Sequence, residues 1–272
     1  MAQGPRHGTA KLRAAVAPGG PRGDRAQAAD RWQPADQASV ERIRQARSAN
    51  WPELRRGTQN ELAELNRQRG LSIEAMREAE ERGFLHFGEF CGRTFWSITD
   101  GRRELIELRR VTGELWPAYR PKGLVARKAH CIGAGKAWPI GIAESKRFPA
   151  LALVEGAPDF VAAIHFAQIE GKSDTVAPVA MLGAGAARIA AEALIFFEGK
   201  HVRLFPHLDE AGRQASRKWA KQIAEAGAAR VDAFDFARLV RDDGAEGKDL
   251  ADVCRIAPEC YERHRKFSMM LP

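Results

Sequence analysis

Seven residues at the ends of strand-like runs have side chains that could support metal-dependent chemistry. They are Glu155 and Asp159 in "VEGAPD", His207, Asp209 and Glu210 in "HLDEAG", and Asp249 and Asp252 in "GKDLAD". Mg²⁺ prefers a few carboxylates together with water and substrate phosphates. Acids that converge on a rigid sheet therefore suit phosphoryl transfer. The alternative is that the acids of each stretch only cap a helix N-terminus. This explains any one of the three stretches but explains their coincidence less well.

The elements that must position these residues alternate from Pro149 onward. Strand-like runs are "ALALVEG", "VAPVAMLG", "HVRLFPH" and "RVDAFDF", and helix-like runs are "PDFVAAIHFAQIEG", "AARIAAEALIFFEG", "EAGRQASRKWAKQIAEAG" and the short "KDLADVCR". Strands that alternate with helices of this length predict right-handed crossovers and a parallel sheet of about four strands. Sites in such sheets lie beyond the carboxyl ends of the strands. We therefore expect Glu155 and Asp209 to face one cleft.

The chain before this region divides by composition. Residues 1–36 are rich in Gly, Pro, Ala and Arg and indicate a disordered basic tail. Residues 37–83 have a helical pattern, with Pro52 and Ser72 at candidate helix starts, and are either a helix-turn-helix or a plain helical hairpin. Residues 84–147 contain short β-rich runs and predict an antiparallel subdomain. We expect the parallel-sheet domain over 148–256 and a C-terminal tail over 257–272.

The run "HCIGAGKA" within the β-rich region imitates a phosphate-binding P-loop. When Lys136 is aligned with the lysine of that motif, His130 falls on the first glycine and Ala137 on the Ser or Thr that would hold Mg²⁺. Two required positions therefore fail, and the sequence excludes a P-loop ATPase site here.

Charge and cysteine usage restrict the class of protein. The formal net charge is +8, with the basic excess in residues 1–72 and 101–130. This excess favours a polyanionic partner or, equally, a solvated surface of mixed charge. The four cysteines never occur as C-x-x-C, which excludes a zinc ribbon of ordinary spacing and indicates a reducing, cytoplasmic setting. No apolar run approaches the length of a membrane span, and the N-terminus is not a secretory signal.

The stretches "LVEGAPD", "FPHLDEAGRQA" and "GKDLAD", with about fifty residues of strand and helix between the first two, resemble a Toprim domain. They are most similar to the Toprim region of bacterial and phage-type DNA primases, over about residues 149 to 255. The resemblance implies a Toprim-like parallel sheet flanked by helices, preceded by the β-rich subdomain and the N-terminal helical segment. The family signature is a glutamate after the first strand and Asp-x-Asp after the third.

The resemblance also implies roles for the acidic residues. Glu155 matches the family's glutamate, a general base or acid, and Asp209 matches the second acid of Asp-x-Asp, a metal ligand. His207 stands in place of the first acid. Glu210 could take over that role, Asp249 or Asp252 could supply another ligand, and Asp159 is a further candidate ligand. Imidazole is a poorer ligand for Mg²⁺ than for Mn²⁺, so the expected cofactor is Mg²⁺ with tolerance of Mn²⁺.

The implied activity is metal-dependent nucleotidyl transfer on single-stranded DNA with nucleoside triphosphates, in a DNA-replication protein of a bacterium, phage or mobile element. It allows a separate helicase as a partner. Five basic residues are candidates for contacting nucleic acid or triphosphate, through phosphate contacts that weaken with salt: Arg109, Arg110, Lys122, Lys128 and Lys248. Two alternatives stay open. They are a Toprim nuclease that uses the same acids, and a non-catalytic nucleic-acid-binding module, which the substitution at His207 favours.

Overall fold

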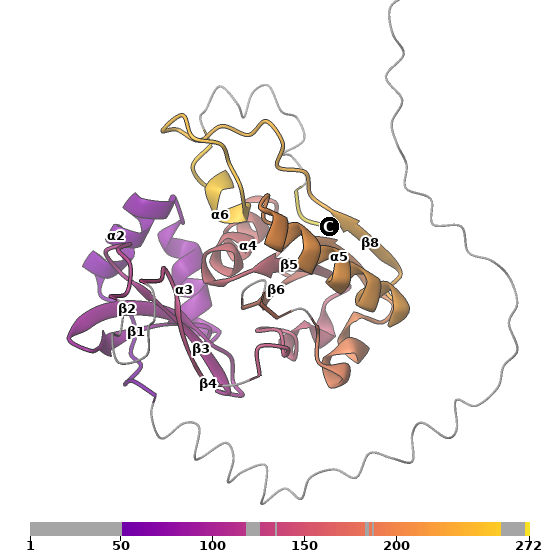
Figure 1. Ribbon diagram of the computed structural model, residues 1–272, viewed down its shortest axis with the longest axis horizontal. Helices are drawn as coiled ribbons and strands as arrows, with labels where there is room; N and C mark the ends of the chain where they lie inside the picture. Colours follow the sequence, from indigo (N-terminus) through magenta and orange to yellow (C-terminus); the bar gives the residue numbers. More distant parts are fainter. Residues whose placement is uncertain (1–50, 118–125, 134, 183–184, 187, 257–269) are drawn as a thin grey trace, which may run out of the picture. The chain divides into compact units, whose positions relative to one another are not determined.

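The computed structural model describes residues 51–117, 126–133, 135–182, 185–186, 188–256 and 270–272 (Figure 1). The basic tail expected over 1–36, Lys122 and most of the C-terminal tail lie outside the described residues. Among those described, no helix is long and apolar enough to cross a lipid bilayer.

Two short helices open the described chain. They are α2 (Gln59–Arg69) and α3 (Ile73–Glu81). The Thr58 hydroxyl accepts a hydrogen bond from the Glu61 backbone N–H at the start of α2, and Ser72 caps α3 as the sequence predicted. The expectation of a helix start at Pro52 was wrong, because the chain there is extended and Arg55 pairs with Phe87 in an antiparallel bridge.

The β-rich region forms an antiparallel sheet in the order β1-β2-β3-β4. The strands are β1 (Leu85–Phe90), β2 (Arg93–Ile98), β3 (Leu105–Arg110) and β4 (His130–Gly133). Side chains alternate between its faces, so Trp96 packs toward the main core while its neighbour Phe95 packs into a smaller apolar cluster on the other side. The run that imitates a P-loop supplies strand β4.

The second sheet is parallel throughout and has the order β6-β5-β7-β8. Its strands are β5 (Ala150–Glu155), β6 (Val176–Met181), β7 (His201–Leu204) and β8 (Arg230–Ala233). Every residue of β5 and β6 is buried, as expected for strands covered on both faces. The predicted fold class, a four-stranded parallel sheet flanked by helices and preceded by a small β-rich subdomain, is confirmed.

Helices cover the two faces of the parallel sheet. Residues of α4 (Ala157–Ile169) share a core with Ala152 and Val154 of β5, whereas α5 (Glu210–Glu225) packs on the face that carries Leu151 and Leu153. The buried residues of α5 include Ala215, Trp219 and Ile223, which recur at helical spacing on one side of it. A short helix, α6 (Leu250–Val253), follows β8.

The crossover between β6 and β7 differs from the sequence prediction. We expected an α-helix, but η4 (Ala191–Phe197) is a 3₁₀ helix. Its N-cap residue is Ala190, whose side chain cannot make a capping hydrogen bond, unlike Thr58 before α2 and Ser72 before α3. The segment buries only Ala193 and Phe197, which anchor it to the sheet without a longer apolar stripe.

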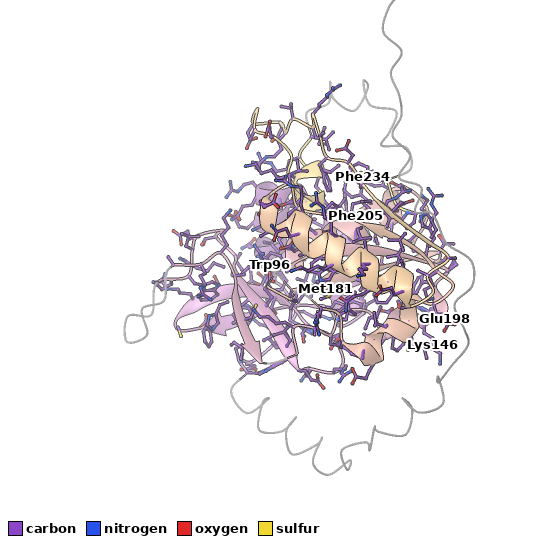
Figure 2. All side chains as sticks on the ribbon, turned by 45° about the vertical axis from the view of Figure 1, so that its right-hand side comes forward. Trp96, Lys146, Met181, Glu198, Phe205 and Phe234 are labelled. Atoms are coloured by element: carbon purple, nitrogen blue, oxygen red, sulfur yellow. The ribbon has the colours of Figure 1, made fainter. Side chains whose placement is uncertain are left out.

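One hydrophobic core joins the helical segment, the antiparallel sheet and one face of the parallel sheet. Leu62 of α2, Trp96 of β2 and Phe160 of α4 all belong to it. Phe205 also belongs to this core, and its ring stacks on that of Phe234 with centroids 5.7 Å apart; both residues are labelled in Figure 2. The strand ends of both sheets are therefore fixed relative to one another by shared packing.

We predict that Gly70 holds the helical segment against the segment that follows α6. Gly70 has φ +70°, and a Cβ there would overlap the carbonyl oxygen of Cys254. Gly83 has nearly the same φ, +74°, but a Cβ there would meet nothing within 4 Å. Gly83→Ala should cost about 1–2 kcal/mol of unfolding free energy from backbone strain alone. Gly70→Ala should cost about 1–3 kcal/mol more, because the backbone must shift.

Urea denaturation of both variants measures the difference. Equal losses in the two variants would show that the contact between Gly70 and Cys254 does not exist in solution.

Candidate functional site

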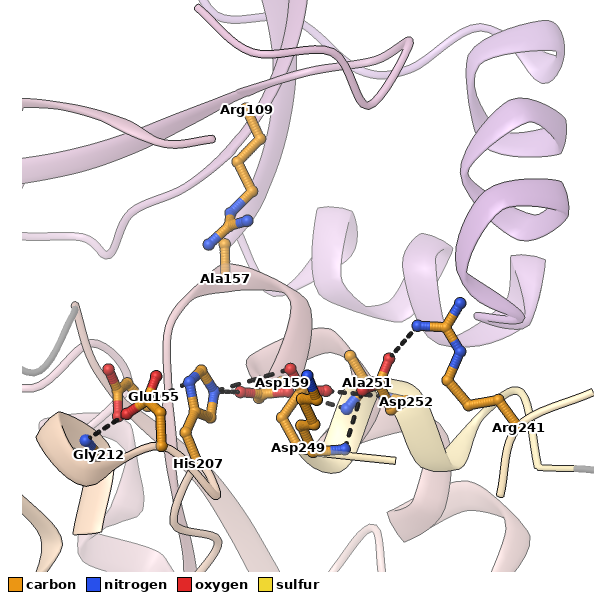
Figure 3. A network of polar contacts seen from close by, with 12 residues as sticks. Arg109, Glu155, Ala157, Asp159, His207, Gly212, Arg241, Asp249, Ala251 and Asp252 are labelled. Carbon is orange, nitrogen blue, oxygen red and sulfur yellow. Dashed lines mark hydrogen bonds and ion pairs between the residues drawn. The ribbon is translucent and has the colours of Figure 1, made fainter. Parts of the chain in front are cut away.

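The site lies where β5 and β7 end. Because these neighbouring strands are parallel, Glu155 at the end of β5 and the loop with His207 after β7 emerge at the same edge of the sheet. Asp159 follows in the first turn of α4, and Asp249 is the N-cap of α6. Three separate segments thus bring side chains to one place (Figure 3).

The carboxylate of Asp159 is buried, with 1% of the residue exposed. Its Oδ1 accepts a hydrogen bond of 2.8 Å from the backbone N–H of Ala251, and its Oδ2 lies 2.7 Å from Nε2 of His207. A buried charge is costly unless it is paired and hydrogen-bonded, and these contacts provide both. Asp159 therefore links α4 to α6 and to the loop after β7.

The imidazole of His207 lies among three carboxylates. Besides the contact with Asp159, its Nδ1 is 3.9 Å from Glu155 Oε2, and its Nε2 is 3.9 Å from Asp249 Oδ2. Burial disfavours the imidazolium, but the hydrogen bond to Asp159 and the charges of the three acids outweigh it and raise the pKa of His207 to about 10. In the metal-free protein His207 is therefore a cation at neutral pH.

The carboxyl group of Asp249 is partly buried near two other acids. Burial, followed by the charges of Asp159 and Asp252, raises its pKa to about 7, although its Oδ1 accepts a 2.8 Å hydrogen bond from the Asp252 N–H. An acid that titrates near neutral pH in a cleft is typical of functional sites.

The cluster fits a divalent metal by its donor atoms. One ligand atom each from Asp159, His207 and Asp249 can be chosen so that all lie within 4.8 Å of one another. Metal–ligand bonds of about 2 Å would need these atoms to close in slightly. Binding would also displace the proton of His207, because only neutral imidazole is a ligand. One nitrogen with carboxylate oxygens suits Mn²⁺ better than Mg²⁺.

Asp209 and Glu210 are placed differently from this cluster. Asp209 caps α5, and its Oδ1 accepts a 2.7 Å hydrogen bond from the Gly212 N–H, so its carboxylate lines the cleft without joining the cluster. Glu210 is exposed and contacts Arg213 and Gln214. Position 212 requires glycine, because a Cβ there would approach Cβ of His207 to 2.7 Å.

A cleft of about 880 Å³ opens over the acidic cluster. Eight arginines and lysines, here called its basic wall, line it together with further acids such as Glu114 and Glu246. Four of the five basic residues expected to contact nucleic acid line it, namely Arg109, Arg110, Lys128 and Lys248. Lys122 lies outside the described residues. The predicted basic residues and the acidic cluster therefore share one cavity.

Sequence reasoning missed one residue of this wall and the ion-pair partner of another. Arg69, at the end of α2, lies in the cleft, where burial and the nearby charge of Arg109 lower its pKa to about 10 and leave it charged at neutral pH. Glu107 is buried and pairs with Arg109 at 2.6 Å, which holds the arginine above the start of α4 (Figure 3). The spacing of Glu107 and Arg109 along a strand could have indicated that they share a face.

Comparisons with known proteins give a remote likeness. No family model and no curated protein matches the chain. Among solved structures, the chain is similar to the crystal structure of the primase fragment of the bacteriophage T7 primase-helicase protein. The two are 17% identical with a TM-score of 0.44, over 74% of this chain and 70% of that one. This likeness by itself assigns no function to the chain.

We predict that His207 makes stability depend on pH above neutrality. A folded pKa of about 10 against an unfolded value of about 6.5 means that its contribution is complete below pH 6.5 and is lost as pH rises toward 10. The window of Asp249 ends near pH 7. Groups that titrate at higher pH, such as Cys254 and Arg69, are shared with a variant at position 207, and their contributions cancel in the comparison. Urea denaturation with chelator should show that the stability advantage over His207→Gln shrinks from about pH 8 to about pH 10.

The same variant provides the control, because glutamine keeps a polar side chain but does not titrate. An advantage that stays constant across this range would mean that His207 is neutral in the folded protein.

Proposed function

We propose that this protein performs metal-dependent nucleotidyl transfer on single-stranded nucleic acid, as a primase-like enzyme. The observation that carries the proposal is the approach of Asp159, His207 and Asp249 within a cleft that eight arginines and lysines also line. Converging acids suit a metal ion, and a facing basic wall suits phosphates. A site with both is appropriate for joining a triphosphate to a strand.

Asp159, His207 and Asp249 would hold the metal ion. When bound, the ion supplies charge that stabilises the transferring phosphoryl group. Asp159 is held by the Ala251 N–H, so its position does not depend on the ligand. The mixed donor set favours Mn²⁺, with Mg²⁺ as the alternative cofactor. Asp209, first expected as a ligand, is assigned instead to capping α5 beside this group.

Glu155 would act as the general base. It is mostly buried at the mouth of the cleft, beside His207, where it can accept the proton of an attacking hydroxyl group. Arg109 and Arg69 would bind the phosphates of the triphosphate or strand, because both line the cleft and Arg109 is fixed by Glu107. Arg110, Lys128 and Lys248 would guide the nucleic acid along the same wall.

The His207–Asp159 ion pair supports a second candidate, a non-catalytic nucleic-acid-binding module. In that state the imidazolium supplies within the cluster the positive charge that a metal ion would otherwise bring. The basic wall would still bind phosphates, and no chemistry would follow. The two candidates differ in whether a metal ion displaces the proton.

We predict activity that depends on both the metal cluster and Glu155. Incubation with labelled nucleoside triphosphates and single-stranded DNA should give extension products with Mn²⁺ and fewer with Mg²⁺. Asp249→Asn should weaken Mn²⁺ binding in titration calorimetry and abolish extension. Glu155→Gln should keep Mn²⁺ binding and lower extension about 100-fold or more, as loss of a general base does.

The matched control is Glu225→Gln, an exposed acid at the end of α5. It should leave metal binding and extension unchanged. Cleavage of the DNA in place of extension would assign the same acids to a nuclease. Strand binding without either product, and without Mn²⁺ binding, would establish the non-catalytic module and contradict the proposal.

A further inference from the structure

A second cleft, of about 680 Å³, adjoins the first at the antiparallel sheet. Arg109, Glu155 and His207 line both clefts, so the second one continues from the acidic cluster. Its far wall comes from the end of β1, the segment after β3, and β4. The proposed chemistry uses no residue of this far wall.

Three aromatic rings form that wall. Phe90 and His130 are stacked with centroids 5.3 Å apart and planes at 26°, and Trp116 meets Phe90 edge-on at 5.9 Å. The Trp116 indole donates a 3.1 Å hydrogen bond to the Leu108 carbonyl, which fixes its ring. Phe90 and Trp116 pack on one side against the small apolar cluster that contains Phe95. All three line the cleft, and Phe90 and His130 are only half-buried.

Cationic side chains surround the rings. Arg93, Arg127 and Lys136 are exposed and line the cleft, and Lys136 belongs to the run that imitates a P-loop. The acids in the lining are Glu107, which pairs with Arg109, and Glu155 at the junction with the first cleft. Burial and then the charge of Arg127 lower the pKa of His130, so its ring is neutral at pH 7. The wall therefore suits a flat, apolar group that carries negative charge.

A nucleotide has this chemistry, because any base can stack on an aromatic ring while its phosphate contacts cations. We propose that the second cleft is a nucleobase subsite. The base stacks against the Phe90, Trp116 and His130 wall, and the adjoining phosphate points along Arg109 toward the acidic cluster. This inference deepens the proposed function and rests on it for the direction of the phosphate. The base belongs either to a free nucleotide or to a strand.

The test compares strands with and without bases. Fluorescence anisotropy measures binding of a labelled thymidine oligonucleotide and of an abasic strand with the same number of phosphates. Chelator is present throughout, so binding does not depend on metal chemistry. The wild-type protein should bind the base-containing strand about fivefold more tightly or better, as one stacked base provides. Phe90→Leu and His130→Ala should each reduce this preference and leave abasic binding unchanged.

Phe196→Leu is the matched control, because it removes a half-buried ring, packed edge-on against Trp138, outside both clefts. It should keep the preference. Competition shows which molecule supplies the bound base. Displacement of the labelled oligonucleotide by thymidine triphosphate identifies a free nucleotide. Displacement by unlabelled oligonucleotide but not by thymidine triphosphate identifies a strand.

Equal affinity of the wild-type protein for the two strands would overturn the subsite. A preference that survives in both Phe90→Leu and His130→Ala would also overturn it. These outcomes are distinct from failure of the proposed function. A protein that binds the base-containing strand more tightly but does not extend it would support the nucleobase subsite and contradict the nucleotidyl-transfer activity.

Discussion

The burial of the Asp159 carboxylate is the constraint on which the rest of the site depends. A charge with so little exposure requires partners, and this one takes them from two other segments, the Ala251 N–H at α6 and the His207 ring after β7. Those contacts fix the position of Asp249, which precedes α6, relative to Glu155, which precedes α4. The cluster is thus part of the folded architecture rather than an arrangement of surface acids.

This constraint also explains how a histidine is accommodated at position 207. Another carboxylate at position 207 would face Asp159, Glu155 and Asp249 with no cation among the four, and would depend on bound metal to offset their repulsion. The imidazolium supplies that charge internally. A metal ion must therefore compete with a proton, and its affinity should increase with pH.

The sequence predicted the parts of the molecule that follow from local pattern. Alternating strands and helices implied the parallel sheet. The rule that sites lie at strand carboxyl ends predicted that Glu155 and Asp209 face one cleft, and both residues line it. The pairing of Asp159 with His207 could not be predicted, because it depends on how α4 packs. Asp209 was expected to bind metal, yet as the residue before α5 its carboxylate also suited a helix cap, and local pattern does not separate the two uses. Phe90 and His130 belong to the two edge strands of the antiparallel sheet, so local sequence pattern could not predict that their rings stack.

The central claim is that Asp159, His207 and Asp249 form one metal site. Anomalous scattering from crystals soaked in Mn²⁺ above neutral pH tests it most directly. The account predicts a peak within about 2 Å of one carboxylate oxygen of Asp159, one ring nitrogen of His207 and one carboxylate oxygen of Asp249. A peak held by Asp209 and Glu210 instead, or no peak in the cleft at saturating Mn²⁺, would contradict it.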